Sequence, residues 1–140
     1  MNNENTAKLF SEFDHLFRDR HKSEKESLMC WGFTCDDGWF RLIYSIAQMI
    51  TDYVHAHPGV DCAAFQVKQK FGGLRFYIEG GDDTLRAMIA KQSMKSFEIC
   101  ELCSAPAELR ESPGGAIKTL CSDCYPAWRA TLPAGAERLL

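Results

Sequence analysis

Residues 64–79 read AFQVKQKFGGLRFYIE, and this stretch decides the fold. Apolar and polar residues alternate along it, which is the pattern of β-strands that bury one face. Gly72-Gly73 lies in the middle, and paired glycines readily take the positive φ angles of a tight hairpin turn. We therefore predict an antiparallel hairpin that turns at this dipeptide, with Phe71 facing Leu74 and Lys70 facing Arg75.

The predicted register gives the hairpin one apolar face and one basic face. In this register Lys68 faces Tyr77 and Val67 faces Ile78. The apolar side chains share one side, and they are Phe65, Val67, Phe71, Leu74, Phe76 and Ile78. The opposite side carries Lys68, Lys70, Arg75 and Tyr77. A slip of one residue would turn the apolar set toward water, so the register is well specified.

The basic face has two interpretations. Basic residues interleaved with an aromatic ring are typical of surfaces that bind single-stranded nucleic acid, where bases stack on the ring. Alternating strands also place charged residues in solvent without any function. The set Lys68, Lys70, Arg75 and Tyr77 is therefore a candidate for binding a partner or a nucleic acid, or simply a solvated sheet face.

Helical periodicity surrounds the hairpin. Leu9, Phe10, Phe13, Leu16 and Phe17 predict an N-terminal helix that Asn5 or Thr6 would cap. A second helix follows an irregular loop over residues 30–40 and runs to Pro58-Gly59, with Asp36 or Asp37 near its N-cap. A third helix begins at Asp82 or Asp83. We expect these helices to pack on one face of the hairpin or a small sheet, which is an α+β fold.

Four cysteines near the C-terminus have the spacing C-x2-C-x17-C-x2-C, and they are Cys100, Cys103, Cys121 and Cys124. Each C-x2-C folds into a tight knuckle, so that two knuckles place four thiolates about 2.3 Å from one tetrahedral ion. Pro113-Gly114-Gly115 can turn a hairpin between the knuckles, and residues 125–132 have helical spacing. This order is that of a treble-clef finger, so the pattern predicts one Zn²⁺.

Four thiolates leave no open position for water or substrate, so the zinc is expected to be structural. The alternative is four cysteines that are buried or joined in disulfides. Cys30 and Cys35 are candidates for a second metal site together with Cys62 or with His55 and His57, although free cysteines are commonly just buried. The histidines at 55 and 57 are more simply interpreted as helix-end or solvent residues.

Composition limits the class of protein. The chain of 140 residues has a formal net charge of −3 and a hydrophobic fraction of 46%, which suits one globular domain. That charge argues against a nucleic-acid binder that depends on bulk positive charge, but a local basic patch remains compatible with it. The start, Met1 to Asn5, lacks the basic and apolar regions of a secretory signal, so we expect a cytoplasmic protein.

Catalytic signatures are absent from the sequence. It contains no H-E-x-x-H, no phosphate loop, no G-x-S-x-G and no zinc-deaminase pattern. No histidine lies in the finger, where a His-metal nuclease would need one. The acidic pairs Asp36-Asp37 and Asp82-Asp83 stand where helices need N-caps. We therefore expect a protein without enzymatic activity, and a metal-dependent enzyme using Asp36, Asp37 or the histidines is the weakest alternative.

Three segments together resemble a family of short phage and prophage proteins. The segments are C-D-D-G-W-F at 35–40, Q-V-K-Q-K-F-G-G-L-R-F-Y at 66–77, and the paired knuckles. The family has a C-G-D-G-W box, a K-F-G-G-L-R-F-Y hairpin and a C-terminal zinc finger in this order. Asp36 stands where the family has Gly, and Ser104 where Gly often follows the first knuckle. The likeness spans Cys35 to Cys124 and carries no activity or catalytic residue.

The resemblance implies a biological setting, which is that of a phage or prophage protein. Small phage proteins without catalytic motifs commonly act by binding, and many inhibit host defence complexes such as CRISPR effectors. By analogy, the leading hypothesis is a zinc-binding accessory protein that binds a host protein complex in the bacterial cytoplasm. The alternative is a nucleic-acid-binding accessory protein that uses the basic face of the hairpin. We expect a body over residues 1–96, a zinc finger over 97–132 docked on it, and a tail at 133–140.

Overall fold

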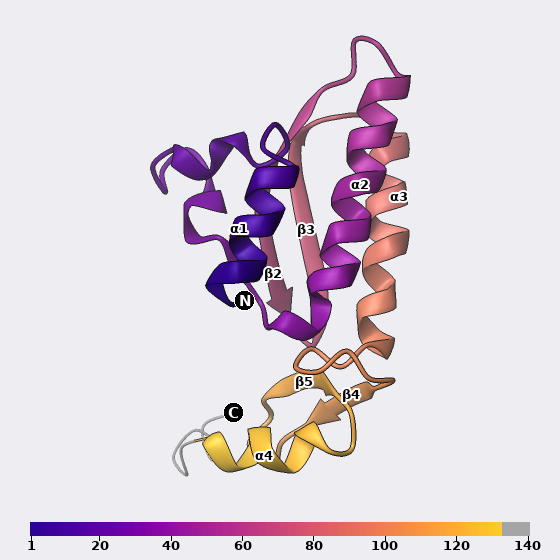
Figure 1. Cartoon of the computed structure of the whole chain (residues 1–140). Helices are drawn as coiled ribbons and strands as arrows, with labels where there is room; N and C mark the ends of the chain where they lie inside the picture. Colours follow the sequence, from indigo (N-terminus) through magenta and orange to yellow (C-terminus); the bar gives the residue numbers. More distant parts are fainter. Residues whose placement is uncertain (133–140) are drawn as a thin grey trace.

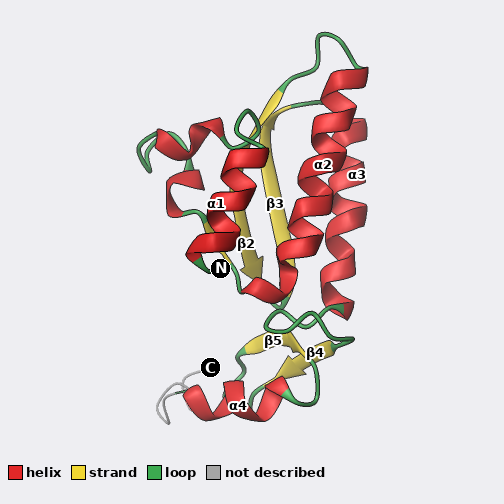
Figure 2. Ribbon diagram, in the orientation of Figure 1, coloured by secondary structure: helices red, strands yellow, loops and turns green. Residues whose placement is uncertain are grey.

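A computed structural model of the chain describes residues 1–132, and the predicted tail at 133–140 lies outside them. The helices are α1 (Asn3–Glu12), α2 (Phe40–Ala56), α3 (Asp83–Ser93) and α4 (Cys124–Thr131), and short 3-10 helices join them. The strands are β1 (Phe33–Thr34), β2 (Cys62–Lys70), β3 (Gly73–Gly80), β4 (Glu108–Glu111) and β5 (Ile117–Leu120). Figures 1 and 2 show β2 and β3 beside the first three helices, and β4–β5 with α4 below them. The predicted α+β class is confirmed.

The hairpin forms where it was predicted, but it turns one residue earlier. Lys70 pairs with Gly73, and Lys68 pairs with Arg75. The two turn residues are Phe71 and Gly72, with φ angles of 54° and 82°, so both take the positive φ of a type I′ turn. All four predicted pairs are therefore wrong, which are Phe71 with Leu74, Lys70 with Arg75, Lys68 with Tyr77 and Val67 with Ile78.

Packing explains why the turn excludes Gly73. A Cβ on this glycine would lie 2.4 Å from the ring of Phe97. Gly73 is therefore needed for the close packing of Phe97 and not for the turn. Phe71 takes the strained turn position, and its ring lies on the surface. The residue expected on the apolar side of the hairpin is thus exposed at its tip.

A short strand and a bulge complete the sheet. β1 pairs parallel to β2, with Phe33 beside Val67, and the strand order is β1-β2-β3. Two residues are too few for an alternating pattern, which is why the sequence did not reveal β1. The ladder shifts between Ala64 and Gln66, so Phe65 occupies a bulge and leaves the predicted apolar row.

The main core lies on one face of this sheet. Phe33, Val67 and Phe76 stand side by side across the three strands, and all three are buried. The ring of Phe17 meets that of Phe33 at a centroid distance of 5.1 Å. Trp39 is fully buried at the start of α2. Trp31 is 64% exposed, because it ends a short 3-10 helix just before β1 and its side chain stays outside the core.

Helix ends differ in how well the sequence located them. Asp82 caps α3 as predicted, accepting a hydrogen bond from the backbone N–H of Leu85 at 2.8 Å. The cap of α1 is Asn2, not Asn5 or Thr6. This helix ends at Glu12, so the apolar residues from Phe13 to Phe17 continue the core through turns rather than helix.

Candidate metal centre and basic sheet face

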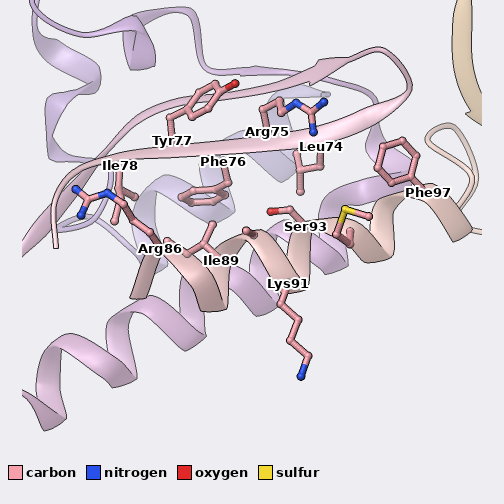
Figure 3. A pocket seen from close by; sticks show the side chains of 12 residues that line it. Leu74, Arg75, Phe76, Tyr77, Ile78, Arg86, Ile89, Lys91, Ser93 and Phe97 are labelled. Atoms are coloured by element: carbon pink, nitrogen blue, oxygen red, sulfur yellow. The ribbon is translucent and has the colours of Figure 1, made fainter. Parts of the chain in front are cut away.

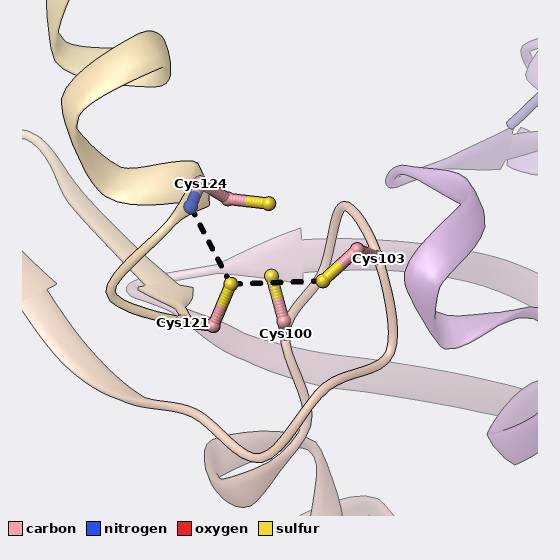
Figure 4. A group of neighbouring side chains, drawn as sticks. All are labelled: Cys100, Cys103, Cys121 and Cys124. Carbon is pink, nitrogen blue, oxygen red and sulfur yellow. Dashed lines mark hydrogen bonds between the residues drawn. The ribbon is translucent and has the colours of Figure 1, made fainter.

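The four predicted cysteines form one cluster (Figure 4). The sulfurs of Cys100, Cys103, Cys121 and Cys124 all lie within 4.8 Å of one another. The Sγ atoms of Cys103 and Cys121 are 3.6 Å apart. A tetrahedral ion with sulfurs at about 2.3 Å holds them about 3.8 Å apart, so the spacing fits. The cluster is suited to zinc and offers it a closed set of four ligands.

Two knuckles from different elements supply the cysteines. The first bends sharply after Cys100, whose carbonyl accepts from the N–H of Ser104 at 2.9 Å, while Ser104 takes a φ of 72°. The second runs from Cys121, just after β5, to Cys124, the first residue of α4. Knuckle, β4–β5 hairpin, second knuckle and helix follow in the predicted treble-clef order.

The backbone prepares the second knuckle for a metal. The N–H of Cys124 donates to the sulfur of Cys121 at 3.4 Å. This bond lowers the pKa of Cys121 to about 7, so one thiol readily ionises near neutral pH. The neighbouring sulfur of Cys121 raises the pKa of Cys124, because close thiols do not all ionise without a cation. A metal ion would supply that cation.

Few apolar groups surround the sulfurs. The buried members of this second core are Cys100, Leu120 and Cys121, and Tyr125 and Trp128 of α4 cover part of it. The guanidinium of Arg110 lies 5.4 Å from the ring centre of Tyr125. Such a small core does not hold a segment together by burial alone.

The C-D-D-G-W-F box at residues 35–40, which leads into α2, holds the first knuckle, Cys100 to Cys103, against the body. The N–H of Gly38 donates to the carbonyl of Glu101 at 2.7 Å, and the indole of Trp39 donates to the carbonyl of Ile99 at 2.9 Å. The hydroxyl of Ser104 donates to the carbonyl of Gly38 at 2.6 Å. A Cβ on Gly38 would lie 2.1 Å from the carbonyl oxygen of Cys100. Only glycine permits this contact.

The acidic pair in the box does not cap α2, which corrects the sequence interpretation. Asp36 pairs with Lys118 of β5 at 2.9 Å. Asp37 accepts hydrogen bonds from the N–H of Asn2 at 2.8 Å and the side chain of Asn5 at 3.1 Å. The two carboxylates therefore connect the body to the finger and to the N-terminus.

A buried ion pair adds to the junction. Glu101 is 1% exposed and lies 3.4 Å from the ammonium of Lys118, and its carboxylate also accepts from the N–H of Asp36 at 3.0 Å. Burial raises the pKa of Glu101 despite the nearby ammonium. Burial alone would lower the pKa of Lys118, but the hydrogen bond that its ammonium donates to Asp36 and the charge of Glu101 raise it. No local pattern in the sequence reveals this pair, because its members lie on separate elements.

The other cysteines and histidines do not form a second site. Within residues 1–132, the four-cysteine group is the only cluster of metal-ligating side chains. Burial raises the pKa of Cys35 to about 12, and it also raises that of Cys62, so both thiols are unreactive. His57 stacks on Tyr53 at a ring distance of 3.9 Å, whereas His55 is exposed.

The four predicted surface residues do share one face of the sheet, although their pairing differs. Lys68 lies directly across from Arg75, and Tyr77 lies across from Gln66. Arg75 and Tyr77 point away from α3 (Figure 3). Among residues 1–132, neither Lys68 nor Arg75 has an ion-pair partner. Lys70 stands at the end of the row, 5.6 Å from the ring centre of Phe71.

Comparison with known proteins leaves the site to be interpreted from its own chemistry. No family model matches the chain, and neither curated proteins nor solved structures show a significant match to it. Within the described part of the chain, no helix is both long and apolar enough to cross a membrane.

Proposed function

We propose that the chain is a non-enzymatic protein that holds one structural zinc ion and binds single-stranded nucleic acid on the outer face of its sheet. The observation that carries this proposal is that Lys68 and Arg75 face each other across the two strands without an ion-pair partner among residues 1–132, with the exposed Tyr77 on the same face. Phosphates would meet the two cations, and a base would stack on the ring, which is 43% exposed.

Electrostatics also favour a binding role for this face over the interpretation that its charged residues are only solvated. Opposite charges that face each other on neighbouring strands stabilise a sheet. Here two like charges stand directly opposite each other, which is unfavourable unless an anion lies between them. A local basic patch of this kind is compatible with the formal net charge of −3.

Fluorescence anisotropy with a labelled twenty-residue oligothymidine tests the proposal. The double variant Lys68→Ala/Arg75→Ala should weaken binding and reduce the salt slope by about 1.4, given about 0.7 for each phosphate contact. Tyr77→Ala should weaken binding about fivefold or more, because stacking contributes about 1–3 kcal/mol per base. The control Lys25→Ala/Lys95→Ala removes two exposed lysines elsewhere. Equal losses in both double variants would contradict a dedicated face.

A protein partner is the second candidate, and an apolar groove beside β3 favours it. The narrower hypothesis of a phage-encoded inhibitor of a host defence complex is supported by the sequence resemblance alone. Capture of partners from bacterial lysate, with and without nuclease, separates the two candidates. Partners that disappear with nuclease support nucleic-acid binding, and a stoichiometric protein that remains supports the second candidate.

A further inference from the structure

A groove runs between β3 and α3 (Figure 3). Five consecutive residues of β3, Leu74–Ile78, line one side, and the other side includes Ile89, Met94 and Phe97. The groove encloses about 460 Å³ and its lining is mostly apolar. Lining by consecutive strand residues shows that the groove follows the edge of the strand rather than one of its faces.

The free edge of β3 presents unpaired backbone groups to this groove. β3 is the last strand of its sheet, and its only neighbour there is β2. In an antiparallel ladder, alternate residues direct N–H and C=O away from the partner strand. Leu74 shows which residues these are, because its N–H donates outward to the hydroxyl of Ser96 at 2.9 Å. The N–H groups of Phe76 and Ile78 therefore also point outward.

No other part of the described chain takes up these groups. Within residues 1–132, the backbone of Phe76 and Ile78 makes no hydrogen bond outside its own ladder. Strand edges of this kind pair readily with an additional strand unless something covers them. The part of this edge that lines the groove is five residues long, and its unpaired N–H groups are those of Phe76 and Ile78, which suits a short extended segment.

A buried hydroxyl gives independent support. Ser93 of α3 is 7% exposed and lines the groove, and its Oγ has no hydrogen-bond partner. In Figure 3 this oxygen points from the helix toward β3. A buried hydroxyl without a partner is unfavourable, and a peptide group lying over α3 would satisfy it.

The charge around the groove selects the class of ligand. Arg75 and Arg86 lie along it, and none of its lining residues is acidic. The ammonium of Lys91 points away from β3. A second copy of the chain would bring the same two arginines to a surface that already carries them. An acidic segment is favoured instead, because it complements Arg75, which has no ion-pair partner among residues 1–132, and adds to the long contact of Arg86 with the exposed Asp83 at 4.0 Å.

We propose that an extended, acidic peptide segment of another protein adds to the edge of β3 as a further antiparallel or parallel strand. Its backbone pairs with Phe76 and Ile78. Alternate apolar side chains enter the groove toward Ile89 and Met94, and the acidic side chains between them lie beside Arg75. This binding surface is independent of the proposed nucleic-acid face, apart from the shared Arg75.

The test uses the zinc-loaded full chain labelled with ¹⁵N and the peptide acetyl-EVEVEVE-amide. Binding should shift the amide signals of Phe76 and Ile78 and protect both from exchange, as strand addition requires. The matched peptide acetyl-KVKVKVK-amide should bind at least about tenfold more weakly, because it repels the two arginines.

Two pairs of variants locate the site. Ala90→Glu places a carboxylate in the groove, whereas Ala87→Glu makes the same change at an exposed position of α3 outside it. We expect about tenfold weaker peptide binding for A90E and no change for A87E, while both keep the oligothymidine affinity of the wild type. Ser93→Ala should weaken binding about two- to tenfold, the effect of one neutral hydrogen bond.

Several results would overturn the proposal. These are no binding of the acidic peptide at millimolar concentration, equal binding of the lysine peptide, and equal affinity of A90E and A87E. Sedimentation showing a dimer whose Phe76 and Ile78 amides are already protected from exchange without peptide would assign the edge to a second copy. Because the oligothymidine assay reports on the other face, its failure leaves the peptide measurement valid, and the converse also holds.

Discussion

The body and the finger are stabilised in different ways. Twenty buried residues form the core of the body, among them Trp39, Ile46 and Val67. The finger has three, and two of these, Cys100 and Cys121, are metal-ligand candidates. Apolar burial therefore suffices for the body, whereas the finger needs an ion and its contacts with the body. A comparison of variants in the two regions measures how far this division holds.

The largest effect is expected from losing the metal. Cys121→Ser should reduce bound zinc from one ion per chain to none and unfold residues 97–132, because structural zinc contributes on the order of 10 kcal/mol. Elemental analysis and amide dispersion in NMR spectra measure both. Cys30→Ser, at an exposed cysteine outside the cluster, is the control. If C121S kept a full complement of zinc, or if its body unfolded as well, the division between the two regions would be wrong.

The second prediction concerns a substitution in the core of the body, which should destabilise the body and leave the metal in place. Ile46→Ala removes a fully buried side chain of α2, and it should lower the free energy of unfolding by about 2–5 kcal/mol. Zinc content should remain at one ion per chain, because the cysteines do not depend on this residue. Ser45→Ala, at the exposed neighbouring position, should have little effect. Denaturant melts with parallel metal analysis check this, and loss of zinc from I46A would join the two regions into one unit.

A third variant acts on the junction. Gly38→Ala inserts a methyl group 2.1 Å from the carbonyl oxygen of Cys100, so either the box or the knuckle must move. The expected loss is about 1–3 kcal/mol, the range for overpacking, together with weaker zinc affinity. Gly59→Ala is the control, because a Cβ there has nothing within 4 Å and only its positive φ is unfavourable. Equal zinc affinity in the two variants would show that the box does not support the knuckle.

The sequence predicted the features that depend on local patterns in both regions, and it missed those that depend on contacts between distant segments. Periodicity located the hairpin, α2 and α3, and cysteine spacing located the metal cluster, because these signals are local. The register was wrong because nothing near Gly73 reveals that Phe97, more than twenty residues away, needs its space. For the same reason Asp36 was interpreted as a cap, although its partner Lys118 lies on β5. Contacts between distant segments leave no periodic trace.

The smallest expected effect is a pH-dependent loss of stability that concerns the body and not the finger. Asp82 accepts hydrogen bonds from the N–H of Leu85 and the hydroxyl of Tyr53, both at 2.8 Å, and these bonds lower its pKa from 3.8. A carboxyl group whose pKa is lowered by folding stabilises the protein above its unfolded pKa. This contribution disappears as the pH falls through the folded pKa. The effect concerns α3 and α2, and no finger residue takes part in it.

Asp82→Ala should therefore lower the melting temperature at pH 7 by a few degrees at most, the scale of one lost helix cap. The difference from wild type should shrink as the pH drops below 3.8, the ordinary pKa of the group. Melting followed at the methyl signals of Leu85 and Ile89 reports on the body and not on thiolate protonation in the finger. Asp83→Ala is the matched control, because that side chain is fully exposed. A difference between D82A and wild type that persisted at pH 2 would show that lost packing, not the ionised cap, destabilises α3.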